Sequence, residues 1–290
     1  MNRIKILIPV YNDWQSVFKL LEKINSEILR LEDDFSVIIV NDASSEYRAE
    51  LSADLANLKS IQIINMKENR GHARCNAAGL KYINDTEKFD YVIPMDGDGE
   101  DRPEELLLLT EKIRDYPYKV ITANRVKRSE GLIFKFCYLI HKYLTYVFTG
   151  QTIKYGNYTC LPRSVVHSMV NEPATWNSFS GSLAKTVKDK GSIPSERGKR
   201  YFGPSKMSFI NLLKHSFSII AVFKTTLLIR SILFLIAYLF LIIGKISVIT
   251  LIPVIAVIIM MFSVIILSKR ENMTEFNDCL KNIHDINKIK

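Results

Sequence analysis

The stretch that decides the fold runs from Tyr91 to Glu105 and reads YVIPMDGDGEDRPEE. Its apolar first five residues are followed at once by Asp96 and Asp98, with one glycine between them. A short apolar run that ends in turn residues predicts a buried strand with both carboxylates at its end. Carboxylate oxygens suit Mg²⁺ or Mn²⁺, which a substrate's phosphates can share. The stretch therefore predicts phosphate chemistry; the alternative is a pair of loop acids that cap the helix expected after Pro103.

Apolar runs alternate with helical patterns on both sides of this stretch. Predominantly apolar runs predict strands at residues 4–9, 35–40, 61–65 and 119–123. Helices are expected at residues 14–31, 47–57, 71–83 and 103–115. This alternation predicts an α/β fold with a doubly wound, mainly parallel sheet, in which ligands bind at the carboxyl ends of the strands. The loops at those ends carry Tyr11, Asp13, Asp42 and Arg125.

Composition narrows the classes of partner. The 290 residues carry a formal net charge of +9, with a pI near 9.2. The basic residues gather near the apolar C-terminal segments and do not alternate with aromatic residues as on a nucleic-acid platform. We therefore expect a membrane surface with anionic headgroups as partner, and no nucleic acid. The cysteines lie far apart without a CxxC pair, which favours reduced thiols over a disulfide or zinc.

Two C-terminal segments meet the length criterion of about 20 apolar residues for crossing a bilayer. They are Thr225–Gly244 and Ile246–Ser268, and Lys245 alone separates them, which predicts a tight transmembrane hairpin. Arg230 lies near the start of the first segment, where its side chain is expected to snorkel toward the headgroups.

Basic residues at both ends of the hairpin predict its orientation. Lys224 precedes it, and Lys269 and Arg270 follow it, so the positive-inside rule puts both ends in the cytoplasm. We expect a multi-pass protein of the plasma (inner) membrane with its catalytic domain and both termini on the cytoplasmic side. The polar tail, residues 271–290, is expected to be a solvated helix or disordered.

A further segment, residues 131–148, is apolar and aromatic but too polar to span a membrane. It predicts an amphipathic helix lying in the interface, with a core-facing helix as the alternative. Residues 208–223 have the same character. The expected domains are therefore a catalytic domain at 1–207, a juxtamembrane helix at 208–224, two transmembrane helices at 225–268 and a cytoplasmic tail at 269–290.

Four motifs in a fixed order resemble the signature of family 2 glycosyltransferases. They are IPVYN at 8–12, NDAS at 41–44, NRGHA at 69–73 and MDGDGEDRPEE at 95–105. An ordered set is far more specific than any single motif. The resemblance continues through 125–128, 156–158 and 203–207, and is greatest to the polyprenyl-phosphate glycosyltransferases, the branch similar to dolichyl-phosphate mannose synthase and bacterial undecaprenyl-phosphate enzymes. It implies a GT-A-like fold, a nucleotide diphosphate sugar donor, a polyprenyl phosphate acceptor, and Mg²⁺ or Mn²⁺ at Asp96 and Asp98.

The resemblance also implies a nucleotide site at the first three motifs. Asp42 matches an acidic residue that contacts the base or ribose, where a carboxylate can accept from N–H or hydroxyl donors. Small residues at the third motif would let the backbone approach the nucleotide, although a plain helix start explains them too. The nucleotide-binding residues implied here are Pro9, Tyr11, Asp13, Asp42, Gly71 and Ala73.

On the phosphate side, the family implies catalytic roles for Asp98, Arg125 and Arg128. A guanidinium holds phosphate at two points and stays charged, although both arginines read as surface charges without the family context. Lys206, assisted by Arg200, would neutralise the pyrophosphate. The alternative is that Lys206 is an ordinary basic residue beside the membrane.

Asn157 departs from the family pattern, in which related enzymes often have a carboxylate near this position. An amide cannot take a proton, so it cannot serve as a base toward a hydroxyl acceptor. An ionised lipid phosphate needs no such base. Asn157 is expected to be substrate-binding.

The sequence therefore predicts a metal-dependent, inverting enzyme that transfers a sugar from a nucleotide diphosphate sugar to polyprenyl phosphate. Two alternatives stay open: a glycosyltransferase whose acceptor is a hydroxyl of a lipid-linked glycan, and a non-catalytic membrane protein that binds nucleotide sugar. UDP is favoured over GDP, and association of copies through the hairpin is left open.

Overall fold

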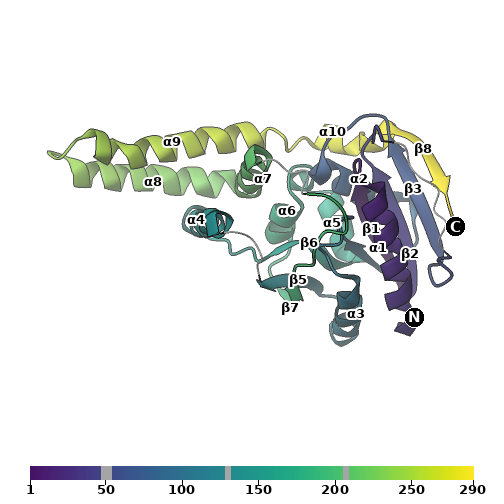
Figure 1. Cartoon of the computed structure of the whole chain (residues 1–290). Coiled ribbons are helices and arrows are strands. Elements are labelled where there is room, and N and C mark those ends of the chain that lie inside the picture. Colours follow the sequence, from purple (N-terminus) through teal and green to yellow (C-terminus); the bar gives the residue numbers. More distant parts are fainter. Residues whose placement is uncertain (47–53, 128–131, 205–208) are drawn as a thin grey trace.

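The computed structural model describes residues 1–46, 54–127, 132–204 and 209–290. One sheet of eight strands, in the order β7-β5-β6-β4-β1-β2-β3-β8, organises the described chain (Figure 1). The strands are β1 (Arg3–Val10), β2 (Asp34–Asn41), β3 (Ser60–Met66), β4 (Tyr91–Pro94), β5 (Val120–Lys127), β6 (Tyr155–Pro162), β7 (Lys190–Glu196) and β8 (Ile283–Lys288).

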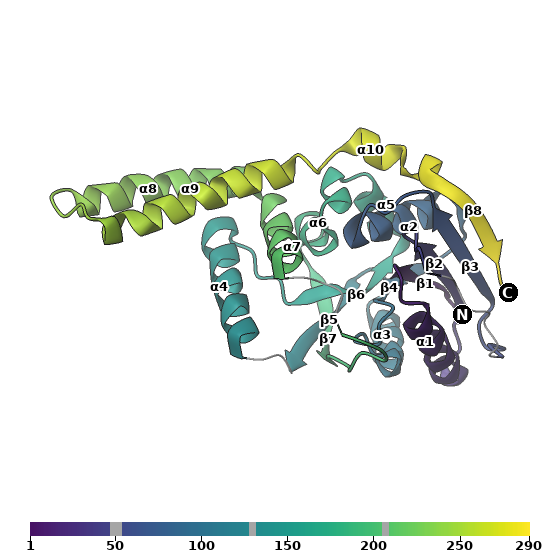
Figure 2. The same cartoon turned by 45° about the horizontal axis from the view of Figure 1, so that its top comes forward.

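Helices cover both faces of the sheet and form the C-terminal arm (Figures 1 and 2). The α-helices are α1 (Trp14–Glu27), α2 (His72–Thr86), α3 (Leu106–Asp115), α4 (Leu132–Thr149), α5 (Arg163–Val170), α6 (Phe179–Thr186), α7 (Phe209–Ala221), α8 (Lys224–Ile242), α9 (Val248–Ser268) and α10 (Met273–Asn277). The short 3-10 helices are η1 (Ile28–Arg30), η2 (Pro103–Glu105), η3 (Pro173–Trp176) and η4 (Cys279–Asn282).

The predicted doubly wound, mainly parallel sheet is confirmed. Strands β4, β1, β2 and β3 are parallel neighbours, as are β5 and β7, whereas β6 and β8 run antiparallel to their partners. One face packs on α1 and α3, and the other on α2, α5 and α6. Because both faces are covered, β1 is buried continuously from Ile4 to Val10 and β4 along its whole length.

The helix predicted at residues 47–57 lies mostly outside the described residues. Its described part, residues 54–57, is not helical and contains only a turn.

The C-terminal tail is part of the sheet and its core, so the prediction of a solvated helix or disorder was wrong. Strand β8 pairs antiparallel with β3 as an edge of the sheet. Phe276 and Cys279 are buried, and the Phe276 ring stacks on Trp176 with 5.3 Å between ring centroids. The apolar residues of the tail are too few and its elements too short to give a periodic pattern, which is why the sequence concealed this packing.

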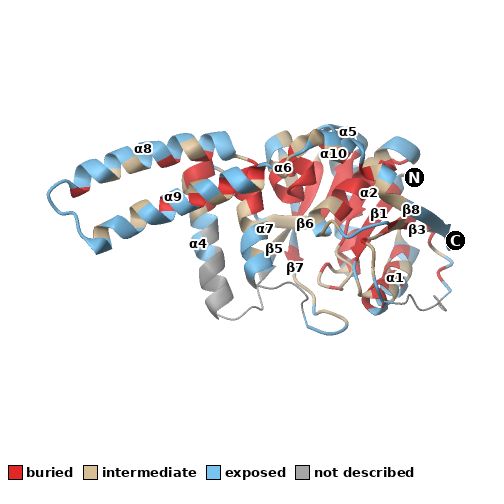
Figure 3. Cartoon of the chain, turned by 90° about the horizontal axis from the view of Figure 1, so that it is seen from above, coloured by how far each residue is buried: buried red, intermediate tan, exposed pale blue. Residues whose placement is uncertain are grey.

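Helices α8 and α9 form an arm that projects from the rest of the molecule (Figure 1). At 1.5 Å per residue, their 19 and 21 residues each span about 30 Å, and both are long and apolar enough to cross a membrane. Much of α8 and α9 is exposed (Figure 3), including large apolar residues such as Phe240 (75% exposed) and Phe262 (64%). A core helix of a water-soluble protein would bury such residues, so the arm needs an apolar environment. Gly244, with φ +78°, lies in the short linker between the helices.

The base of the arm packs on α4 and α7. Phe148 at the end of α4 is buried with Leu227 of α8 and Ile220 of α7. Arg230 does not extend freely, because its guanidinium donates to the Val147 carbonyl at 2.9 Å and the Tyr146 carbonyl at 3.4 Å. These are C-terminal carbonyls of α4, where the helix dipole favours a cation. The arm and the helix predicted at 131–148 are therefore joined by a charged contact.

Candidate active site

The two carboxylates of the opening stretch lie at the carboxyl end of β4, as predicted. Glycine is required twice in this turn. A Cβ at Gly97 would lie 2.8 Å from Val17 Cγ2, and one at Gly99 would lie 2.6 Å from the Tyr201 ring. Gly99 also has φ +89°, a conformation that side chains disfavour. The turn is therefore pressed between α1 and the segment that follows β7.

Asp96 is surrounded by polar groups from three elements. Its Oδ1 lies 3.4 Å from His72 Nε2 on α2 and accepts from Asn157 Nδ2 on β6 at 3.2 Å. His72 and Asn157 also contact each other at 2.7 Å. Burial opposes the charged form of Asp96, but His72, Arg125 and the Asn157 amide outweigh it, and its pKa lies below the usual value. Asp96 is therefore held as a carboxylate.

Asp98 is held by the segment after β7. Its carboxylate pairs with Arg200 and accepts the Glu100 N–H at 2.9 Å, while its carbonyl accepts the Tyr201 N–H at 3.0 Å. Arg200 also reaches Asp13 at 2.9 Å. Burial and the nearby Asp96 charge raise the pKa of Asp98 to about 6. Two carboxylates that repel each other in this way attract a cation.

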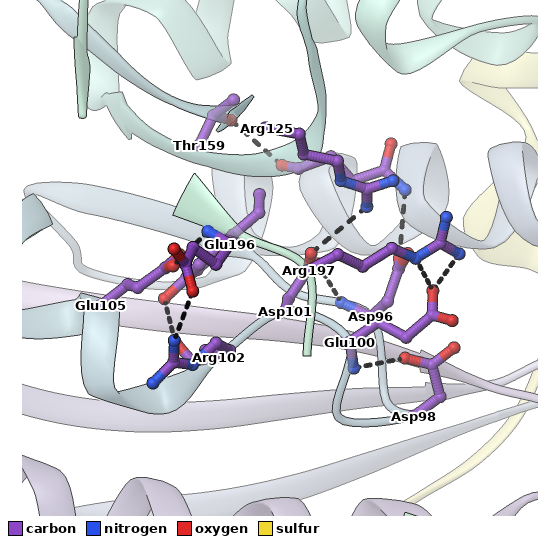
Figure 4. Close-up of polar contacts among 12 residues, drawn as sticks. Asp96, Asp98, Glu100, Asp101, Arg102, Glu105, Arg125, Thr159, Glu196 and Arg197 are labelled. Carbon is purple, nitrogen blue, oxygen red and sulfur yellow. Dashed lines mark hydrogen bonds and ion pairs between the residues drawn. The ribbon is translucent and has the colours of Figure 1, made fainter. Parts of the chain in front are cut away.

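Asp101 is a site residue that the sequence did not single out (Figure 4). Only 4% exposed, it accepts the Asp96 N–H at 2.9 Å and lies 3.5 Å from Arg125 Nη2. Burial, followed by the charge of Asp96, raises its pKa to about 8. Asp101 therefore connects the predicted phosphate-binding Arg125 to the turn that carries Asp96. His72 was likewise present in a motif without a predicted role.

The predicted nucleotide residues lie at the same edge of the sheet. Pro9 lies next to the last residue of β1 and is buried, while Tyr11 in the next loop is 47% exposed. Asp42 is 4% exposed, and burial raises its pKa. Its oxygens accept the N–H groups of Arg70 at 2.9 Å and Gly71 at 2.8 Å. Asp42 therefore fixes the turn that begins α2, where Ala73 also lies, and direct contact with a nucleotide stays a prediction.

Arg128 and Lys206 lie outside the described residues. The described part of the segment after β7 is anchored to the acidic turn, because Gly198 donates its N–H to the Glu100 carbonyl at 2.8 Å and Arg197 pairs with the Glu100 carboxylate. Arg200 thus lies beside Asp98 and Asp13. Its predicted role in neutralising the pyrophosphate stays a prediction.

The donor set fits a divalent cation that also binds phosphate. Within the described ranges, no group of three or more His, Cys, Asp or Glu residues has the arrangement of a complete metal site. Asp96 and Asp98 do offer hard oxygen ligands with side chains 27% and 18% exposed. Mg²⁺ is typically held by one or two carboxylates together with substrate phosphates and water, which matches this pair.

Known proteins match most of this chain in sequence. The model of Glycosyl transferase family 2 matches residues 5–170. A protein named undecaprenyl-phosphate 4-deoxy-4-formamido-L-arabinose transferase from Enterobacter sp. (strain 638) is 27% identical over 235 residues, covering 78% of this chain and 69% of its own length. Its counterpart in Photorhabdus laumondii is 28% identical over 234 residues, with the same shares.

Solved structures share the fold at low sequence identity. Glucosyl-3-phosphoglycerate synthase from Mycobacterium tuberculosis, in complex with Mn²⁺, UDP and phosphoglyceric acid, has a TM-score of 0.55 at 11% identity and covers 78% of each chain. A mannosyltransferase from Pyrobaculum calidifontis, in complex with GDP-Man and Mn²⁺, has a TM-score of 0.51 at 14% identity over 97% of this chain and 86% of its own. The predicted GT-A-like fold is confirmed.

Proposed function

We propose that this chain, which belongs to glycosyl transferase family 2 and is a glycosyltransferase, transfers one sugar from a nucleotide diphosphate sugar to a polyprenyl phosphate. The relatives named above are undecaprenyl-phosphate transferases, which supports a lipid phosphate as acceptor. The observation that carries the proposal is the exposed apolar arm, because an enzyme held at a bilayer by such helices has a lipid acceptor within reach.

The arm supports a defined topology. Strand β8 follows the arm and pairs with β3, so the chain returns to the domain that it left. If α8 and α9 cross the bilayer, the catalytic domain and the tail lie on the same side. Lys224, Lys269 and Arg270 at the ends of the arm favour the cytoplasmic side of the inner membrane.

Exposed residues on α4 and α7 would bring the acceptor to the site. Exposed Tyr143 and Tyr146 on α4, with Ile210 on α7, suit the boundary between headgroups and acyl chains. The lipid tail would stay in the bilayer while its phosphate reaches the carboxyl edge of the sheet.

The chemistry follows from the site residues. The acceptor phosphate is already ionised and attacks the anomeric carbon, so Asn157 is not required to take a proton. We propose inversion at that carbon. Arg125 and Arg200, with Arg128 and Lys206, would hold the phosphates in line for attack. A divalent cation bound by Asp96 and Asp98 would stabilise the negative charge of the departing diphosphate.

The donor nucleotide is proposed to be UDP, with GDP as second choice. In the proposed arrangement the nucleotide lies against Pro9, Tyr11 and the turn at Gly71, while Asp42 holds that turn in place.

Sugar transfer into an organic-extractable lipid tests the proposal. Purified full-length protein would receive undecaprenyl phosphate, Mn²⁺ and labelled UDP-sugars or GDP-sugars. We expect label in the organic phase, and EDTA should abolish it. Asp98→Ala should lower kcat/KM by about a hundredfold or more, since it removes a ligand of the diphosphate-binding cation. Asp115→Ala, at an exposed carboxylate far from the site, is the matched control. Full transfer by Asp98→Ala would refute the metal role.

A further inference from the structure

The C-terminal tail meets the nucleotide-side turn along most of its length. The turn comprises residues 67–74, between β3 and the first turn of α2. Lys67 donates its N–H to the Asn282 carbonyl at 2.8 Å and its Nζ to the Lys281 carbonyl at 2.9 Å. Figures 1 and 2 both show α10 and β8 beside β3 and α2. The tail that follows the membrane arm is therefore attached to the site.

Glu275 is the charged centre of this contact. Its Oε1 lies 2.8 Å from Arg70 Nη1, and its Oε2 lies 3.2 Å from Arg74 Nη2. One carboxylate thus joins two arginines on either side of Gly71 and His72. Asn272 fixes Glu275 by accepting its N–H at 3.1 Å.

Buried rings lie under this ion pair. The Arg74 guanidinium lies 5.2 Å from the centre of the Trp176 ring, on which Phe276 stacks. Phe276 is adjacent to Glu275 and fully buried. The carboxylate is therefore presented from a rigid support and not from a free chain end.

The turn at residues 67–74 also contacts the acidic residues Asp42 and Asp96. The N–H groups of Arg70 and Gly71 bind Asp42, and the next residue, His72, contacts Asp96 and Asn157. The side chains of Glu275, Arg70 and Arg74 are each between 20% and 28% exposed. Partly exposed ion pairs contribute little to stability, so the value of this one lies in the orientation that it imposes.

We propose that Glu275 is a positioning residue for glycosyl transfer. It holds the turn in register with Asp42 so that Gly71 faces the nucleotide and His72 stays beside Asp96. The membrane arm ends at Ser268, only a few residues before Glu275, so the tail connects the anchor to the donor site. The inference rests on the proposed nucleotide site but does not depend on which acceptor takes the sugar.

Glu275→Gln tests the proposal, because it removes the charge and keeps the shape. Asp278→Asn is the matched control, since Asp278 is a carboxylate of the same tail whose ion-pair partner among the described residues is the exposed Lys281. Hydrogen exchange on the full-length protein should become about fivefold faster or more in a peptide that covers residues 67–75 of Glu275→Gln. It should stay unchanged in Asp278→Asn, and both variants should melt within about 2 °C of wild type.

Calorimetry supplies the functional readout, with UDP and GDP as separate probes in Mn²⁺. We expect Glu275→Gln to weaken the nucleotide that wild type binds by about fivefold to twentyfold. In transfer assays, KM for the nucleotide sugar should rise by a similar factor, with kcat and the lipid KM changed less than about twofold. Unchanged exchange, unchanged nucleotide affinity, or wild-type protein that binds neither nucleotide would each overturn the inference. Failure to glycosylate polyprenyl phosphate, with these differences intact, would refute only the proposed acceptor.

Discussion

The packing of the tail can be tested with Phe276→Ala. The side chain is fully buried and stacked on Trp176, so its truncation leaves a cavity in the main core. A buried Phe→Ala change costs about 3–5 kcal/mol of unfolding free energy. For a chain of this size each kcal/mol lowers Tm by about 2–4 °C, so we expect a decrease of about 10 °C.

Thermal melts followed by tryptophan fluorescence in detergent measure this decrease. Ile286→Ala is the control, because Ile286 lies in the same tail but is 40% exposed, and we expect a decrease of only about 2–4 °C. Local detachment of the tail would show as faster limited proteolysis after residue 268. If Phe276→Ala melts and is cleaved like Ile286→Ala, the tail is not part of the core and the reasoning fails.

Three further predictions concern the site and the arm. Asp101→Ala should lower transfer activity by about tenfold or more, because the Asp96 N–H and Arg125 lose their buried partner; activity equal to wild type would contradict this. Gly99→Ala should cost about 1–2 kcal/mol in backbone strain alone and lower both Tm and kcat, and a melt identical to wild type would count against the positive φ. Arg230→Gln should weaken the contact between α4 and α8 and raise KM for the lipid about threefold to tenfold. The KM of Arg230→Gln for the nucleotide sugar should not change. A change in that KM with an unchanged KM for the lipid would refute a role at the membrane.

Much of the fold could be predicted because its central strands contain predominantly apolar runs. The strands β1, β2, β3 and β4 are buried on both faces, so their sequences show them directly. The arm was visible for a related reason, since a helix in lipid is apolar all round. Strand β8 (Ile283–Lys288) is an exposed edge strand with mostly polar residues. Nothing in its sequence pattern distinguishes it from a solvent-exposed chain terminus.

The site was only partly predictable for a geometric reason. The motifs identified the edge of the sheet but not which acid points inward, and Asp101 stands beside other acids in the same stretch. The partnership of Arg200 with Asp98 and Asp13 spans most of the catalytic domain, so no local pattern encodes it. No local pattern shows that the Asp42 oxygens accept the N–H groups of Arg70 and Gly71. Short-range patterns do not reveal such long-range contacts.

The identity of the bond formed on the lipid tests the central claim most directly. Wild-type protein would be given a labelled nucleotide sugar with polyprenyl phosphate in one reaction and a lipid-linked glycan in another, and each lipid product would be treated with mild acid. The proposed function predicts one sugar added to polyprenyl phosphate and released by acid, because the sugar is attached through a phosphate ester. Label that enters only the lipid-linked glycan and resists mild acid would show a hydroxyl acceptor and contradict the account.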